Sequence, residues 1–156
     1  MSLVGCRVGR ADYEAVLADA RRAQALLHGD AAGAGLDVDK AWHGIHYLLT
    51  GSEWEAGPGA GAAVLGGEVL VAEGVDGPPR LLGPAVVREV AAGLAAVDVA
   101  WLRDRFDAEE LTGAGIYPAV WDDEDFDGYL LPHFEELREF YRAAAAQGEA
   151  VLLVIS

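Results

Sequence analysis

Apolar residues occur in short runs near the two ends of the chain, and these runs predict strands. Residues 3–9 are short, apolar and partly β-branched, which favours a first strand. Residues 151–155 form an unbroken apolar run, typical of a central strand that is covered on both faces. A third, shorter strand is predicted over residues 80–82.

Between these runs, apolar residues recur every three or four positions, which predicts helices. Single helices are expected over residues 12–27, 38–49 and 84–94, and a long one over 123–147. Two short helices are expected after residues with good N-cap side chains. The predicted N-caps are Asp12, Asp37 or Asp39, Asp98 and Asp107, and Gly51 is predicted to end the second helix.

Two prolines modify this pattern. Pro118 keeps Tyr117 out of the helical region, so residues 115–121 are expected to be extended. Pro132 lies inside the long helix, where it removes a backbone donor and clashes with the preceding turn. We therefore expect that helix to be kinked or split in two.

The order of strands and helices predicts an α/β fold, a three-layer αβα sandwich around a small mixed β-sheet. An α+β fold with a mostly antiparallel sheet remains an alternative. With 156 residues, the chain is expected to form a single domain over 1–156.

The formal net charge is −15, and it is concentrated in the second part of the chain. Residues 107–156 carry 12 acidic and 2 basic side chains, whereas residues 1–106 carry 14 and 9. Such a surface repels phosphate backbones and anionic lipids, so we expect neither nucleic acid nor a membrane as partner. It suits a basic protein, although an acidic surface that only confers solubility gives the same pattern.

The compartment is predicted from the single cysteine and from the absence of targeting signals. Cys6 has no second cysteine to pair with, which makes a reducing compartment the default. No apolar run approaches the ~20 residues needed to span a bilayer. We expect a cytoplasmic protein with Cys6 buried in the first strand.

Residues 36–51 are the densest polar and aromatic segment of the chain. Lys40 is its only lysine, against ten arginines. On a helix with ~100° between residues, one stripe carries a carboxylate, two imidazoles and a hydroxyl beside an indole, and Lys40 points away from it. The stripe consists of Asp39, His43, His46 and Thr50, with Trp42 at its edge. These groups suit acid–base chemistry or a metal, but packed histidines and a capping aspartate are the simpler interpretation.

Several other kinds of site are disfavoured. None of the serines lies in a G-x-S-x-G motif. Residues 123–128 match the first half of a calcium loop, but Phe134 stands where the bidentate glutamate is required. We expect no metal and no cofactor.

The segment 36–51, together with Val64–Gly67, Gly77–Leu82, Ala114–Pro118 and the region from Tyr129 onward, resembles the bacterial YfbM-like family, whose function is not established. The resemblance covers essentially the whole chain. It implies an αβα sandwich in a cytoplasmic protein, and it implies no substrate, cofactor or catalytic residue.

Two functional hypotheses follow. The first is a binding protein without chemistry of its own, which presents its acidic surface at 107–127 to a basic protein and neutralises it. The second is a small enzyme or ligand-binding domain with a pocket lined by Asp39, His43, His46 and Trp42. A scaffold role in a homo-oligomer stays open. The candidate ligand-binding residues are Asp37, Asp39, Lys40, Trp42, His43, His46, Thr50, Tyr117 and Trp121.

Overall fold

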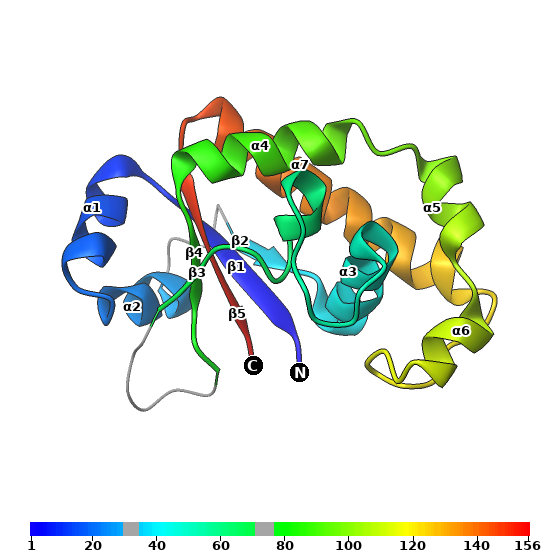
Figure 1. Ribbon diagram of the computed structural model, residues 1–156. Helices are drawn as coiled ribbons and strands as arrows, with labels where there is room; N and C mark the ends of the chain where they lie inside the picture. The colour runs from blue at the N-terminus through cyan, green and yellow to red at the C-terminus, as the bar shows by residue number, and fades with distance from the viewer. Residues whose placement is uncertain (30–34, 71–76) are drawn as a thin grey trace.

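The computed structural model describes residues 1–29, 35–70 and 77–156 and contains a five-stranded sheet with helices on both faces (Figure 1). The strands are β1 (Leu3–Val8), β2 (Gly35–Asp37), β3 (Glu68–Val69), β4 (Arg80–Leu82) and β5 (Ala150–Ile155). The α-helices are α1 (Arg10–Ala18), α2 (Arg22–His28), α3 (Trp42–Thr50), α4 (Pro84–Ala95), α5 (Val99–Arg105), α6 (Ala108–Gly113) and α7 (Leu131–Ala146). Two 3₁₀ turns, η2 (Asp39–Ala41) and η3 (Gly59–Ala62), and a π-helical turn, η4 (Phe126–Leu130), complete the set.

The strand order is β2-β1-β5-β4-β3, and each of the four pairings between described strands is antiparallel. The longest pairing joins the two ends of the chain and runs from Leu3 opposite Ile155 to Val8 opposite Ala150. Strand β5 therefore occupies the centre, as its unbroken apolar run predicts.

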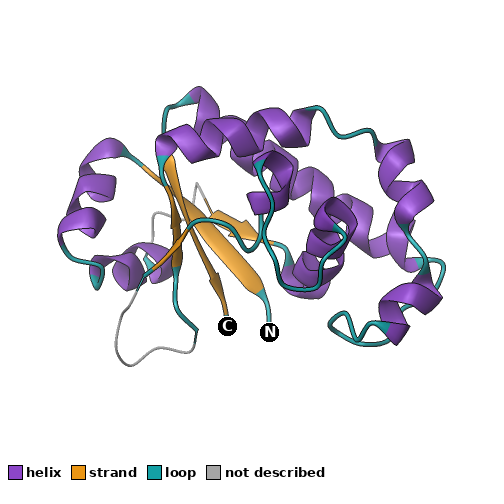
Figure 2. Ribbon diagram, viewed as in Figure 1, coloured by secondary structure: helices purple, strands orange, loops and turns teal. Residues whose placement is uncertain are grey.

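Helices lie on both sides of the sheet (Figure 2), and the sheet separates two apolar cores. Leu152 of β5 and Val8 of β1 face the smaller core, beneath α1 and α2. Val151 and Leu153 face the larger core, which α3, α4 and α7 cover. Because successive side chains of a strand point to opposite faces, every position of β5 but its last is buried.

This arrangement confirms the predicted layering of helices around a β-sheet. The antiparallel pairings correspond to the alternative form of that prediction. The strands predicted at 3–9, 80–82 and 151–155 are present, and so are the helix that begins at Pro84 and the N-caps Asp98 and Asp107. The short strands β2 and β3 are absent from the sequence-based prediction.

The first predicted helix was wrong in both its start and its length. It begins at Arg10 after Gly9, so Asp12 lies in its first turn instead of capping it. It also ends at Ala18, because Asp19 accepts hydrogen bonds from both the backbone N–H and the guanidinium of Arg21. Such a local side-chain hydrogen bond competes with the backbone hydrogen bonds of the helix. The chain therefore leaves α1 here and begins a second helix, α2, at Arg22.

The two proline-containing segments differ in outcome. Residues 116–119 form a tight turn, with a cis Tyr117–Pro118 bond and a 2.7 Å hydrogen bond from the Ala119 N–H to the Ile116 carbonyl, so the extended segment predicted there was wrong. Pro132 does not split the long helix in two, because the π-helical turn Phe126–Leu130 leads without a break into α7, whose first turn contains Pro132. The irregularity beside the proline is this π-helical turn, a common distortion of long helices.

Among the described helices, none combines the length and apolar character that crossing a bilayer requires.

Helix α3 packs very closely against the segment that precedes α7. A Cβ added at Gly44 meets Leu130 Cδ2 at 2.9 Å and the Trp121 ring at 2.9 Å. A glycine inside a helix normally destabilises it by ~1 kcal/mol relative to alanine, so this close approach is the reason that a glycine is required here.

We predict that Gly44→Ala lowers the free energy of unfolding by about 1–2 kcal/mol, since the clash outweighs the gain in helix propensity. Gly128→Ala is the matched control, because an added Cβ there meets no atom within 4 Å. Urea unfolding of both variants measures the effect. Equal stability of the two variants would contradict the packing described here.

Candidate functional site

The candidate site begins where β2 turns into α3. The Asp37 carboxylate accepts the backbone N–H of Asp39 at 2.8 Å, and Asp39 adopts a left-handed conformation with φ of 49°. The chain then makes one 3₁₀ turn before α3 starts at Trp42. The prediction of a helix that begins at Val38 was therefore wrong, and Asp39 does not lie on the helix face that carries the two imidazoles.

The Asp39 carboxylate is bound by two hydroxyl groups. Tyr129 Oη donates to Oδ2 at 2.7 Å, and Ser2 Oγ donates to Oδ1 at 3.3 Å. The same Tyr129 oxygen accepts the backbone N–H of Lys40 at 3.0 Å. The hydrogen bond from Tyr129 is the main reason that the pKa of Asp39 is lowered, while burial and the same bond raise the pKa of Tyr129. This network holds an unfavourable backbone conformation in place.

His43 joins two separate segments through its two ring nitrogens. Its Nε2 lies 2.8 Å from the Glu53 carbonyl, and its Nδ1 lies 2.8 Å from the backbone nitrogen of Tyr117. A carbonyl only accepts and an amide N–H only donates, so His43 is neutral and carries its proton on Nε2. The ring is 2 % exposed, and burial lowers its pKa.

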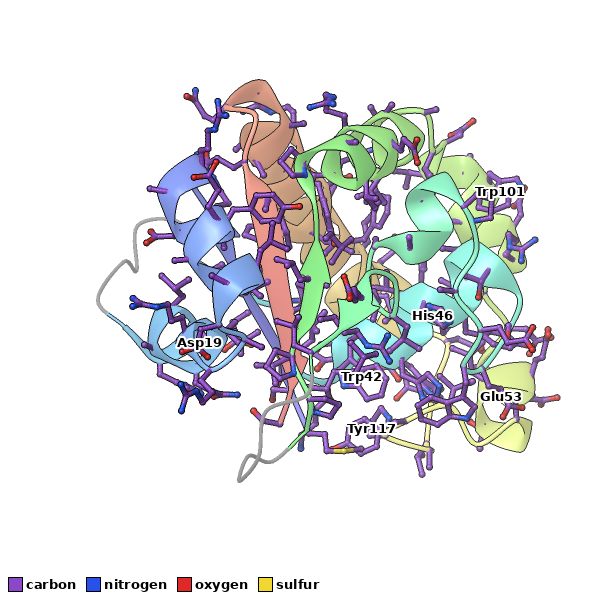
Figure 3. The ribbon with its side chains drawn as sticks, turned by 60° about the vertical axis from the view of Figure 1, so that its left-hand side comes forward. Asp19, Trp42, His46, Glu53, Trp101 and Tyr117 are labelled. Carbon is purple, nitrogen blue, oxygen red and sulfur yellow. The ribbon has the colours of Figure 1, made fainter. Side chains whose placement is uncertain are left out.

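His43 and three other rings form one cluster. Trp42 stacks on His43 with centroids 4.8 Å apart and on Tyr117 at 5.9 Å. Trp54 packs on the imidazole at 4.5 Å and on Trp42 at 6.2 Å. Trp42 is buried, whereas Trp54 is 60 % exposed. Figure 3 shows Trp42, Tyr117 and Glu53 in the same part of the molecule.

His46 is sealed in the protein. It is 1 % exposed, and its Nε2 has no hydrogen-bond partner among the described residues. Burial, with smaller contributions from His43 and Arg80, lowers its pKa to about 4. A neutral, buried imidazole with an unbonded nitrogen is not placed to exchange protons with a ligand from solvent.

The Thr50 hydroxyl acts at the end of α3. It donates to the His46 carbonyl at 2.8 Å and accepts the Ser52 N–H at 3.0 Å. Gly51 follows with φ of 74° and ends the helix, as predicted.

Lys40 lines an open groove of about 270 Å³ beside the 116–119 turn. The groove is lined by Lys40, Pro118, Val120, Trp121, Asp125 and Tyr129. Trp121 is fixed there because its indole N–H donates to the Ile116 carbonyl at 2.9 Å and its backbone N–H to Thr112 Oγ1 at 3.0 Å.

The structure therefore does not bring the predicted site residues together in one place. Trp42, His43 and Tyr117 form an aromatic cluster beneath Trp54, and Lys40 and Trp121 line the groove. His46 lies in the interior, whereas Asp37 and Thr50 hold the two ends of the segment. In the described parts of the chain, no three His, Cys, Asp or Glu side chains lie together as metal ligands would.

Sequence reasoning missed Glu53, Trp54 and Glu55. These residues stand in a glycine-rich loop without helical or strand periodicity, so no pattern marks them. The only feature of the sequence that marks them is the residue types, because a tryptophan between two glutamates has no apolar neighbours with which to form a buried face. Asp125 and Tyr129 were also missed, and the role of Tyr129 depends on contacts with residues about ninety positions away.

Comparisons with known proteins give a consistent result. The family described as "Domain of unknown function (DUF1877)" matches residues 1–154. Protein YfbM from Escherichia coli (strain K12) is 34% identical over 130 residues, which cover 77% of this chain and 75% of that protein. The crystal structure of YfbM from Escherichia coli, described as a protein of unknown function, superimposes with a TM-score of 0.79 at 25% identity over 100% of both proteins.

We predict that His46 makes the protein less stable as the pH falls from about 6.5 to about 4. The unfolded chain binds a proton in this window, but the folded chain resists it until its lower pKa is reached. The contribution of neutral His46 to the free energy of unfolding is therefore fully present above pH ~6.5. Roughly 3 kcal/mol of that free energy is lost when the pH has fallen to about 4. Urea unfolding across this pH range measures the slope.

The matched control is His46→Gln, which keeps a polar side chain but cannot titrate. Its free energy of unfolding is expected to depend less steeply on pH than that of the unmodified protein, whatever its absolute stability. Parallel pH profiles for the two proteins would show that His46 is not the group responsible.

Proposed function

We propose that this chain, which belongs to the DUF1877 family of unknown function, is a binding protein that recognises a basic partner protein. The proposed contact surface consists of Glu53, Trp54 and Glu55 together with the acidic segment 107–127, and we call it the Trp54 surface. The observation that carries the proposal is an exposed, immobilised tryptophan between two exposed carboxylates, with no cation stacked on it in the described structure.

Trp54 is presented as a rigid surface group. His43 and Trp42 pack against its ring, and the His43 Nε2–H bond to the Glu53 carbonyl holds the adjacent backbone. A large side chain that is ordered before binding loses little conformational entropy when a partner arrives. Tryptophan is also enriched among the residues that dominate binding energy at interfaces.

Several arginines of this protein stack on other aromatic rings. Arg105 lies 4.5 Å from the Trp101 centroid, Arg103 lies 5.4 Å from Phe126, and Arg138 lies 5.1 Å from Phe134. No arginine or lysine among the described residues has this relation to Trp54. Its indole is therefore available to a guanidinium or ammonium group of a partner, a contact strengthened by the negative charge around it.

The neighbouring segment adds a negative potential. Residues 107–127 contain eight acidic and no basic side chains. Within the described structure, Arg103 with Asp127 is the ion pair that involves this segment. Because the His43 Nδ1 accepts the Tyr117 N–H and the His43 ring packs on Trp54, Tyr117 of this segment lies near the Trp54 loop. Such a field accelerates association with a basic protein and makes it depend on salt.

The rival function, a small enzyme or ligand-binding domain with a pocket lined by Asp39, His43, His46 and Trp42, receives less support. His43, His46 and Trp42 are buried, and the two hydroxyl groups of Tyr129 and Ser2 occupy the Asp39 carboxylate. We further propose a cytoplasmic location, since the only cysteine is a buried, free thiol whose pKa burial raises to about 11.

The first test measures the role of Trp54 with a fluorescent oligo-arginine peptide, by anisotropy. Trp54→Ala is expected to weaken binding about three- to tenfold, as the loss of a cation–π contact implies. Trp101→Ala is the matched control, because Trp101 is 43 % exposed but already covered by Arg105 and lies in a different part of the molecule (Figure 3). Equal losses in the two variants would refute recognition through Trp54.

The second test measures the role of charge. Asp123→Asn/Glu124→Gln is expected to reduce affinity and the steepness with which affinity falls as NaCl rises from about 0.05 to about 0.5 M. Glu89→Gln/Asp104→Asn removes the same charge outside the surface and serves as the control. An identical salt dependence in both double variants would mean that net charge alone, not this segment, attracts the peptide.

A further inference from the structure

The groove beside Lys40 carries a separate inference. The Lys40 ammonium makes no ion pair or hydrogen bond with another described residue, although Asp125 lines the same groove. Tyr129 and Ser2 donate to the Asp39 oxygens, and Asp125 Oδ2 accepts the Asp122 N–H at 2.8 Å, while Asp125 Oδ1 has no donor in the described structure. The only lysine of the protein and one oxygen of Asp125 are therefore both available to a ligand in the groove.

The lining of the groove combines two opposite charges with an apolar floor and wall. Lys40 supplies a cation and Asp125 a carboxylate, while Trp121, Pro118 and Val120 supply apolar surface. A volume of about 270 Å³ lies just below the ~300–1,000 Å³ that is typical of drug-sized pockets, so the groove suits a small molecule.

A purely anionic ligand is disfavoured by the charge around the groove. Asp122, Asp123 and Glu124 are exposed next to Asp125, and the whole protein has a net charge of −15. A ligand that carries its own positive group beside its negative one avoids this repulsion, since it presents one charge to Lys40 and the other to Asp125.

The walls are fixed before any ligand arrives. Lys40 is held through its backbone N–H on Tyr129, and Trp121 through its bonds to Ile116 and Thr112. Asp39 and Ala119, which precede the groove residues Lys40 and Val120, both have positive φ, 49° and 82°. Non-glycine residues seldom adopt this conformation, and they do so where surrounding contacts impose it.

We propose that this groove binds a free α-amino acid with a large apolar side chain. The carboxylate pairs with the Lys40 ammonium, the α-ammonium pairs with the Asp125 carboxylate, and the apolar group lies against Trp121, Pro118 and Val120. The site shares part of segment 107–127 with the Trp54 surface, but Glu53, Trp54 and Glu55 do not line the groove.

The test uses isothermal titration with L-leucine and L-phenylalanine. Both amino acids are expected to bind, whereas L-leucinamide, which lacks the carboxylate, and N-acetyl-L-leucine, which lacks the ammonium, are expected to bind roughly tenfold more weakly or not at all. Equal binding of N-acetyl-L-leucine would overturn the zwitterion assignment and leave a plain carboxylate site, such as one for the C-terminus of a peptide. No binding of either amino acid would overturn the site.

Two variants place the binding in the groove. Lys40→Met and Asp125→Asn are each expected to lower the affinity for L-leucine about tenfold or more, and Asp125→Asn keeps an oxygen that can accept the Asp122 N–H. Urea unfolding verifies that both variants remain folded. Unchanged affinity in either folded variant would contradict the proposal. Trp54→Ala serves as the control and is expected to leave the affinity for L-leucine unchanged, so failure of the basic-partner proposal and failure of this one are distinguishable.

Discussion

The local structure of the candidate region depends on one imidazole whose two nitrogens are both bonded to backbone. His43 donates to the Glu53 carbonyl and accepts from the Tyr117 N–H, so a single residue of α3 holds two loops that are otherwise far apart in the sequence. Burial keeps the ring neutral, which is the only state in which one nitrogen donates and the other accepts. If His43 were protonated, the bond to Tyr117 would be lost, and the two loops would no longer be held at a fixed distance.

This connection links two surface features through the 116–119 turn. The Trp54 ring packs on His43, which is bonded to the Tyr117 N–H, and is exposed to solvent between two glutamates. Trp121 is anchored to the Ile116 carbonyl and forms part of the Lys40 groove. Both features contain aromatic groups that are held in place, Trp54 by packing on His43 and Trp121 by its bond to Ile116. Groups that are ordered in advance lose little conformational entropy when a ligand binds. The two buried histidines belong to the framework that holds them.

His46 is the one polar group in this framework that lacks a hydrogen bond at a ring nitrogen. A buried polar atom without a hydrogen bond lowers the free energy of unfolding. The lowered pKa of His46 reduces this free energy further at acidic pH. The fold tolerates this because the surrounding apolar core is large and extends from α3 to α4 and α7. The same core explains the close approach of Gly44 to Trp121 and Leu130, which brings α3 within reach of the turn that His43 holds.

The sequence alone determined the parts of this protein that depend on local chemistry and periodicity. The apolar run at 151–155 specified a central strand, Gly51 ended α3, and the segment 36–51 indicated the right family. Only the tertiary structure decided which side chains of the segment 36–51 reach the surface. A helical wheel placed His43 and His46 on a polar stripe, but the loops at Glu53 and Tyr117 fold over that stripe and bury it. Periodicity describes one element at a time, whereas exposure depends on what distant segments cover, and here a loop without any pattern covers the predicted site and carries the exposed tryptophan.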